Sequence, residues 1–230
     1  MVVQSLKARI LASLPAPFRK QLQQLKTHLK VKLLRIARQD IDYFYDEGFA
    51  TSPFRNKSWT PYFCDLILSR FSPQSIIDFG CGTGDILKPF EAKGLDVLGI
   101  DGSQANQTHC QLATGNFWLR DLRDKIHLDR QYDLCICVEV AEHIEEKYSD
   151  TLIQNLATAS ALIIFTAAPP GQDEGIDHCN LKPPQWWIDK FEKIGFGFDR
   201  ASTSWLKAEL SQNAAVQPWY IENLHIFSKQ

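Results

Sequence analysis

The chain has 230 residues, enough for one substantial domain and a short extension. Hydrophobic residues make up 44% of it, and 14 Phe with 6 Trp can fill a large core. The formal net charge of −2 gives no general signal for binding a polyanion, and without a run of 18 apolar residues no transmembrane segment is expected. Six cysteines with no C-x-x-C pair, and no signal-peptide core, predict reduced thiols and a cytoplasmic protein.

Residues 1–39 differ from the rest in charge, because they carry nine Lys or Arg and no acidic residue. Pro15 and Pro17 divide them into a short first helix and a longer second one. Apolar side chains recur at helical spacing and form one stripe, at Leu22, Leu25, Leu29, Leu33 and Ile36. We define residues 1–40 as a basic helical extension. It can pack on the main domain, or dock a carrier, a peptide, an anionic substrate, RNA or a membrane surface.

Residues 40–62 are rich in aromatic side chains, interspersed with acidic ones. Aromatic residues dominate ordinary packing, so most of these are expected to hold the N-terminal helices against the domain. The aromatic positions are Tyr43, Phe44, Tyr45, Phe49, Phe54, Trp59 and Tyr62.

The stretch from Ile76 to Asp85 predicts a buried strand, a glycine turn and the start of a helix. Glycines there let the backbone turn tightly and approach a ligand closely. A dinucleotide fingerprint needs G-x-G-x-x-G, but its third glycine would fall on Asp85 or Leu87. An acid in the first helical turn also disfavours a pyrophosphate, which weakens a nicotinamide dehydrogenase assignment.

The pattern Asp78-x-Gly80-x-Gly82-x-Gly84 resembles motif I of the class I S-adenosylmethionine (SAM)-dependent methyltransferases. This resemblance implies that SAM binds at the turn, with Asp78 and Cys81 beside the three glycines. In that family the segment before motif I often closes over the cofactor. The resemblance therefore places an aromatic lid at residues 41–62, inside a methyltransferase domain of residues 41–230.

Acidic residues follow the next two predicted strands. Residues 96–100 form a strand that ends in Asp101 and Gly102, and an acid at this place suits both ribose hydroxyls. Residues 116–120 form the third strand, followed by Asp121 and Leu122. The family commonly places an acid here against the adenine amino group, which implies Asp121 in that role, with Asp124 as a competitor.

Residues 134–138 form the fourth strand, which the family places beside the first. Glu139, Glu142 and His143 follow at spacings of three and four, so a helical turn would bring them onto one face. Two carboxylates and an imidazole on one face suit a divalent metal ion.

The Glu-x-x-Glu-His cluster with a later histidine, His178, resembles the small-RNA 3′-terminal 2′-O-methyltransferases. The cluster alone also resembles ubiquinone-pathway O-methyltransferases. In the RNA enzymes these positions hold a metal, which implies Mg or Mn at Glu139, Glu142, His143 and His178. Many class I methyltransferases carry a Glu-His pair here without metal, so His143 or His178 as a general base is the alternative.

The tail predicts a helix over 184–194, a strand over 196–199, a short helix over 205–210 and a last strand over 224–227. The resemblance implies an α/β fold, with a Rossmann-like seven-stranded mostly parallel sheet. Its last strand is antiparallel, and helices lie on both faces.

Together these features predict an enzyme that transfers a methyl group from SAM to a hydroxyl or carboxylate oxygen of a small metabolite or natural-product intermediate. RNA 2′-O-methylation is an alternative, although residues 40–230 hold 16 Lys or Arg against all 27 Asp and Glu. A non-catalytic SAM-binding module is a second alternative.

Overall fold

The computed structural model describes residues 15–52, 57–172, 175 and 177–230. The chain divides into two compact units, residues 1–43 and 44–230. No helix within the described ranges combines the length and the apolar character needed to cross a membrane.

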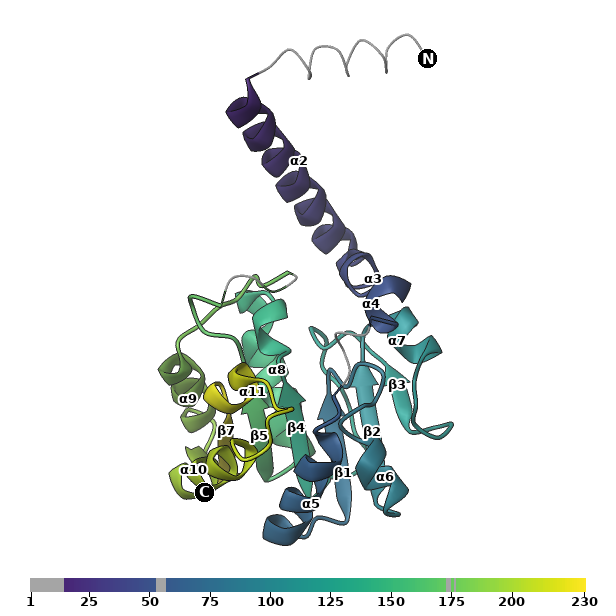
Figure 1. Ribbon diagram of the computed structural model, residues 1–230, viewed down its shortest axis with the longest axis vertical. Helices are drawn as coiled ribbons and strands as arrows, with labels where there is room; N and C mark the ends of the chain where they lie inside the picture. Colours follow the sequence, from purple (N-terminus) through teal and green to yellow (C-terminus); the bar gives the residue numbers. More distant parts are fainter. Residues whose placement is uncertain (1–14, 53–56, 173–174, 176) are drawn as a thin grey trace. The chain divides into compact units, whose positions relative to one another are not determined.

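The first unit contains helix α2 (Ala16–Ala37), which is the longer of the two helices predicted for the basic extension (Figure 1). Pro17 lies in its first turn, where a missing N–H costs nothing. Arg38 ends the helix in the left-handed conformation, with its N–H donating to the carbonyls of Leu34 and Arg35. The predicted first helix lies outside the described residues.

The second unit is built on a seven-stranded sheet in the order β3-β2-β1-β4-β5-β7-β6. Neighbours from β3 to β5 pair in parallel, whereas β7 pairs antiparallel with both β5 and β6. This confirms the predicted fold class. The strands are β1 (Ser75–Phe79), β2 (Asp96–Asp101), β3 (Phe117–Leu119), β4 (Leu134–Val138), β5 (Leu162–Thr166), β6 (Phe196–Phe198) and β7 (His225–Lys229).

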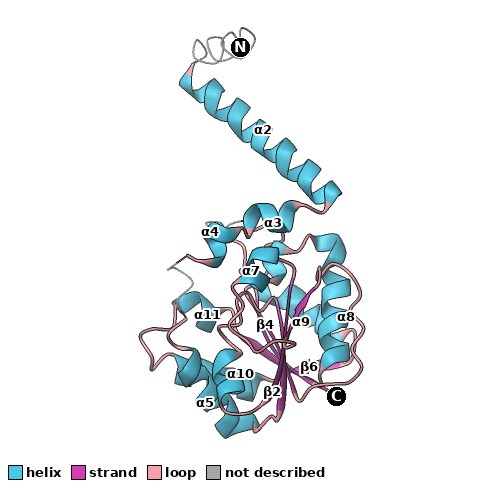
Figure 2. Ribbon diagram, turned by 90° about the vertical axis from the view of Figure 1, so that its right-hand side faces the viewer, coloured by secondary structure: helices cyan, strands magenta, loops and turns pink. Residues whose placement is uncertain are grey.

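Helices cover both faces of this sheet, which Figure 2 shows edge-on. Alternate residues of β1 enter two separate cores, because successive strand side chains point to opposite faces. Ile76 packs with α5, α6 and α10, whereas Ile77 packs with α8 and α9. These helices are α5 (Thr60–Phe71), α6 (Lys88–Ala92), α8 (Ser149–Ala159), α9 (Pro184–Glu192) and α10 (Arg200–Leu210).

Short helices connect these layers. They are α3 (Asp40–Phe44), α4 (Glu47–Ala50), α7 (Gln104–Thr108), α11 (Pro218–Glu222) and the 3₁₀ turns η2 (Ala141–His143) and η3 (Glu146–Tyr148). The six cysteines, all within the described ranges, form no disulfide bond with one another.

Two predicted helix starts were wrong. The helix after the glycine turn begins at Lys88, not Asp85, because Asp85 accepts hydrogen bonds from Thr83 and Gln111 within the preceding turn. Helix α10 begins at Arg200, five residues earlier than predicted. Asp199 caps it by accepting from the Ser202 N–H, a start signal that the apolar pattern did not contain.

Candidate functional site

The glycine turn follows β1 at the carboxyl edge of the parallel strands. Gly80, Gly82 and Gly84 have φ values of 81°, 59° and 89°, a region that side-chain-bearing residues rarely adopt. A Cβ on Gly80 would fall inside the Val140 side chain, and one on Gly84 would lie 2.7 Å from Leu112 Cγ. The turn is therefore packed against its neighbours so closely that only glycine fits.

Asp101 at the end of β2 is bound to this turn. Its Oδ2 accepts from the Gly82 N–H at 2.9 Å, and its Oδ1 accepts from the Ser103 N–H at 2.9 Å and Asn106 Nδ2 at 3.0 Å. Gly102 lies between Asp101 and the cap of α7. The protein itself thus fixes the carboxylate at the edge where the cofactor ribose is predicted.

Asp78 lies beneath the turn and is 1% exposed. Burial, together with the carboxylates of Asp101 and Asp85, raises the pKa of its carboxyl to about 7 against the lowering effect of Lys57. Cys81, also buried, packs its sulfur above Gly99 of β2. Both predicted residues are thus buried at the glycine turn.

Asp121, the predicted adenine-side acid, is held by a neighbour that the sequence analysis did not consider. Arg123 Nε donates to both Asp121 oxygens at 2.9 and 3.0 Å, and its Nη2 donates to Oδ2 at 2.8 Å. Leu122 is 7% exposed and packs in the core. An adenine amino group would share the Asp121 carboxylate with this guanidinium, so the adenine role stays a prediction.

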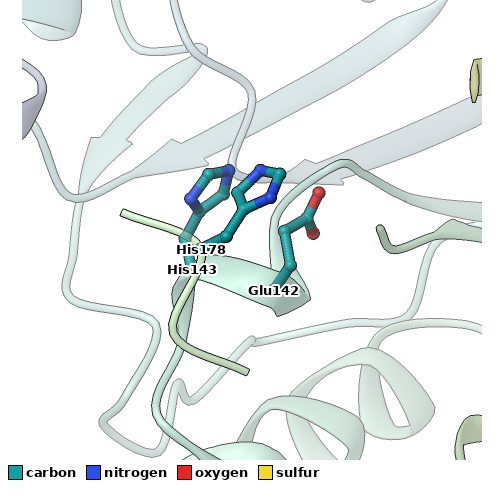
Figure 3. Close-up of side chains that lie close together, drawn as sticks. All are labelled: Glu142, His143 and His178. Atoms are coloured by element: carbon teal, nitrogen blue, oxygen red, sulfur yellow. The ribbon is translucent and has the colours of Figure 1, made fainter. Parts of the chain in front are cut away.

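Glu142, His143 and His178 come together although 35 residues separate the two histidines in sequence. One ligand atom from each lies within 4.8 Å of the other two. Figure 3 shows the carboxylate and both imidazole rings pointing to the same side of turn η2. The ring centroids of the two histidines are 4.9 Å apart.

The loop after β5 is fastened to η2 by hydrogen bonds, which explains how His178 reaches the cluster. The N–H groups of Cys179 and Asn180 both donate to the Glu142 carbonyl at 2.9 Å. Asn180 Nδ2 also donates to Ser149 Oγ at 3.0 Å, and His178 Nδ1 lies 2.7 Å from the Gln172 carbonyl. Residues 173, 174 and 176 of this loop lie outside the described residues.

The Glu142 side chain is fully buried, and neither carboxylate oxygen has a hydrogen-bond donor at bonding geometry among the described residues. Burial and the nearby charge of Glu139 raise the pKa of Glu142 well above its usual range, although the Ala168 N–H lies close enough to oppose this. A buried carboxylate beside two imidazoles fits a divalent cation, which would compensate the buried charge.

Glu139 is not one of these three clustered residues, although its carboxylate interacts with that of Glu142. Its φ of +55° ends β4 in a left-handed residue, and the turn that follows is a 3₁₀ helix over Ala141–His143 only. The predicted shared helical face was therefore wrong. Glu139 instead accepts from Asn223 Nδ2 at 3.3 Å, and its N–H donates to Thr166 Oγ1 at 2.8 Å. A ligand role for Glu139 stays a prediction.

Tyr45 is a site residue that the sequence analysis left among the packing aromatics. Its ring lies edge-on to His143, with centroids 5.7 Å apart, and its backbone carbonyl accepts from Ser103 Oγ at 2.6 Å. Burial, with the charges of Asp177 and Glu142, raises the pKa of its hydroxyl. Tyr45 thus links the His143 cluster to the loop after β2. No spacing pattern in the sequence distinguishes Tyr45 from the other aromatic residues. Phe54 of the predicted lid lies outside the described residues.

A family model described as a methyltransferase domain matches residues 55–200. The ubiquinone biosynthesis O-methyltransferases of Rickettsia canadensis and Rickettsia felis are 32% and 36% identical over 115 residues. That match covers 46% of this chain and 49% and 47% of theirs, so the chain spans about half the length of these curated relatives.

Solved structures share the fold at low identity. The magnesium protoporphyrin IX methyltransferase of Synechocystis PCC 6803 with bound SAM has a TM-score of 0.55 at 18% identity, over 82% of this chain and 90% of that one. The sugar N-methyltransferase KedS8 of Streptoalloteichus has a TM-score of 0.56 at 16% identity, over 82% and 92%. This chain belongs to the methyltransferase domain family, with the architecture of the class I SAM-dependent methyltransferases.

Proposed function

We propose that this protein transfers the methyl group of SAM to an oxygen atom of a small metabolite or natural-product intermediate. The observation that carries the proposal is the Glu142, His143 and His178 cluster at the end of β4, in a chain whose curated relatives are named as O-methyltransferases. SAM is assigned to the glycine turn, with Asp101 on the ribose side and Asp121 on the adenine side.

The reaction needs positioning more than covalent chemistry, because the methyl group on a sulfonium is already activated. The acceptor oxygen forms the new O–C bond as the S–C bond breaks, and alignment of the three atoms lowers the barrier by several kcal/mol. Without a bound cation, the hydroxyl proton would pass to an imidazole, His143 or His178, since an imidazole titrates near neutral pH. A carboxylate acceptor would need no base.

We further propose that Glu142, His143 and His178 hold a divalent cation, Mg or Mn, with Glu139 as an additional candidate ligand. When bound, such a cation lowers the pKa of a coordinated hydroxyl. The cluster would also orient two neighbouring oxygens of the acceptor. The acid excess of residues 40–230 supports a small acceptor over RNA, and the complete cluster supports an enzyme over a non-catalytic SAM-binding module.

The extension of residues 1–40 is a candidate docking surface for a carrier, a peptide or an anionic substrate. Its charge supports this role, since residues 1–39 contain nine cations and no acid.

The function is tested with methyl-labelled SAM and a panel of catechols, phenols, hydroxy acids and amines, with the methylated atom located by NMR. We expect transfer to oxygen, and a loss on the order of 100-fold in His143→Ala and His178→Ala. Exposed His127 provides the matched control as His127→Ala, with turnover unchanged. Methylation of amines alone, or full turnover in both histidine variants, would overturn the proposal.

A further inference from the structure

Helix α2 exposes a continuous row of large apolar side chains that the methyltransferase chemistry does not use. A protein surface rarely leaves so many large apolar groups in one row without a partner. The exposed fractions are 54% for Leu25, 51% for Leu29, 66% for Leu33 and 73% for Ile36.

Cations flank this row on both sides. At 100° per residue, the four apolar side chains fall within about 80° of the helix circumference. Lys26 and Lys30 lie beside one edge of that sector, and Lys32 beside the other. All three lysines are exposed, and α2 contains no acidic residue.

A narrow apolar stripe between lysines fits the boundary between lipid headgroups and acyl chains. The leucines would enter the apolar layer, while the lysine stems reach outward to anionic phosphates. Tyr43, 42% exposed, lies just beyond the helix with Lys30 Nζ 4.0 Å from its ring centroid. A phenol beside a cation is also suited to the headgroup layer.

Other partners match this surface less well. A second copy of α2 would bring two basic helices together, and residues 1–39 contain no acid to compensate them. Nucleic acid would use the lysines but leave the leucine row in water. A carrier or peptide would need both an acidic surface and an apolar groove of matching length. We propose that α2 docks this protein on the surface of a membrane containing anionic phospholipid.

The test uses the full-length protein and vesicle flotation. Phosphatidylcholine vesicles are compared with vesicles containing 30% phosphatidylglycerol, in low and high salt. We expect binding to be at least 10-fold tighter to the anionic vesicles and to weaken as salt rises. The variant with Lys26→Gln, Lys30→Gln and Lys32→Gln should lose on the order of 100-fold in affinity. The variant with Leu29→Gln and Leu33→Gln should lose roughly as much.

A matched control removes three exposed lysines from the second unit, as Lys125→Gln, Lys193→Gln and Lys229→Gln, and should bind vesicles as the parent does. Circular dichroism and SAM titration verify that every variant is folded. Absence of vesicle binding, or binding that survives the leucine changes, would overturn the proposal. Dimerisation that is lost in the leucine variant would also overturn the proposal. The same holds for RNA that displaces the protein from vesicles.

Discussion

The proposed cofactor side and the proposed acceptor side of this site lie at the same edge of one sheet, yet their carboxylates have opposite hydrogen-bonding environments. Asp101 is held by three hydrogen bonds from Gly82, Ser103 and Asn106. Glu142 is more deeply buried, and no described donor meets either of its oxygens at hydrogen-bonding geometry, although the Ala168 N–H lies nearby.

The Asp101 carboxylate is therefore held in place in advance of binding, whereas the Glu142 carboxylate carries an electrostatic cost of burial. Asp101 is stabilised by the fold, so it is ready for a neutral sugar hydroxyl. Glu142 is destabilised as an anion by burial beside Glu139, and a cation or a proton-donating acceptor would relieve that cost.

The largest effect is expected from Gly80→Ala on the cofactor side. Gly94→Ala is a matched control, since φ is +81° at Gly80 and +84° at Gly94, but a Cβ at Gly94 meets nothing within 4 Å. The control should lose about 1–2 kcal/mol from backbone strain alone. Gly80→Ala adds the clash with Val140 and should lose roughly 3–5 kcal/mol, with SAM binding abolished. Urea unfolding measures the stability of each variant, and calorimetry measures its SAM binding. Equal losses of stability in Gly80→Ala and Gly94→Ala would contradict the close packing of Gly80 against Val140.

Glu142→Gln should separate function from stability on the acceptor side. Removing the buried charge is expected to raise the melting temperature in EDTA, while turnover falls by about 100-fold and Mn binding is lost. The control is Glu146→Gln, at an exposed carboxylate paired with Lys182. It should leave the melting temperature, turnover and Mn binding unchanged. A lower melting temperature with normal turnover would show that Glu142 is structural.

Asp78 should make stability depend on pH. Its pKa of about 7 in the folded protein exceeds the value of about 3.9 in an unfolded chain, so stability should fall as pH rises from about 4 to about 7 and then level off. A pKa difference of about three between the folded and unfolded states corresponds to a change in the free energy of unfolding on the order of 4 kcal/mol. Thermal unfolding of Asp78→Asn should show a flatter profile over this range. Parallel profiles for the variant and the parent would exclude Asp78 as the titrating group.

Tyr45→Phe should have the smallest effect, on catalysis alone. The Tyr45 hydroxyl is buried without a described hydrogen-bond partner, so its removal should leave stability unchanged and lower kcat/KM by roughly 3- to 10-fold. Tyr62→Phe is the converse control, because Tyr62 donates to the Glu209 carbonyl at 3.0 Å. It should lose about 1 kcal/mol of stability with normal kinetics. Unchanged kinetics in Tyr45→Phe would remove this residue from the acceptor pocket.

The sequence predicted the geometry of the glycine turn more fully than that of the Glu142 cluster, for a physical reason. Gly80, Gly82 and Asp101 belong to strand ends whose period and turn residues are local signals. His178 reaches its place through backbone hydrogen bonds to Glu142, and Tyr45 through a bond from Ser103. Such contacts leave no periodic trace in the chain. The family resemblance named His178, whereas the positive φ of Glu139 had no signal in the sequence, because nothing at that position favours it.

The most direct test of the central claim is methyl transfer from SAM to a catechol acceptor by the purified protein, before and after EDTA. EDTA should abolish transfer and Mn or Mg should restore it, with SAM binding unchanged throughout. Methyl transfer that continues undiminished in EDTA would contradict a cation at Glu142, His143 and His178.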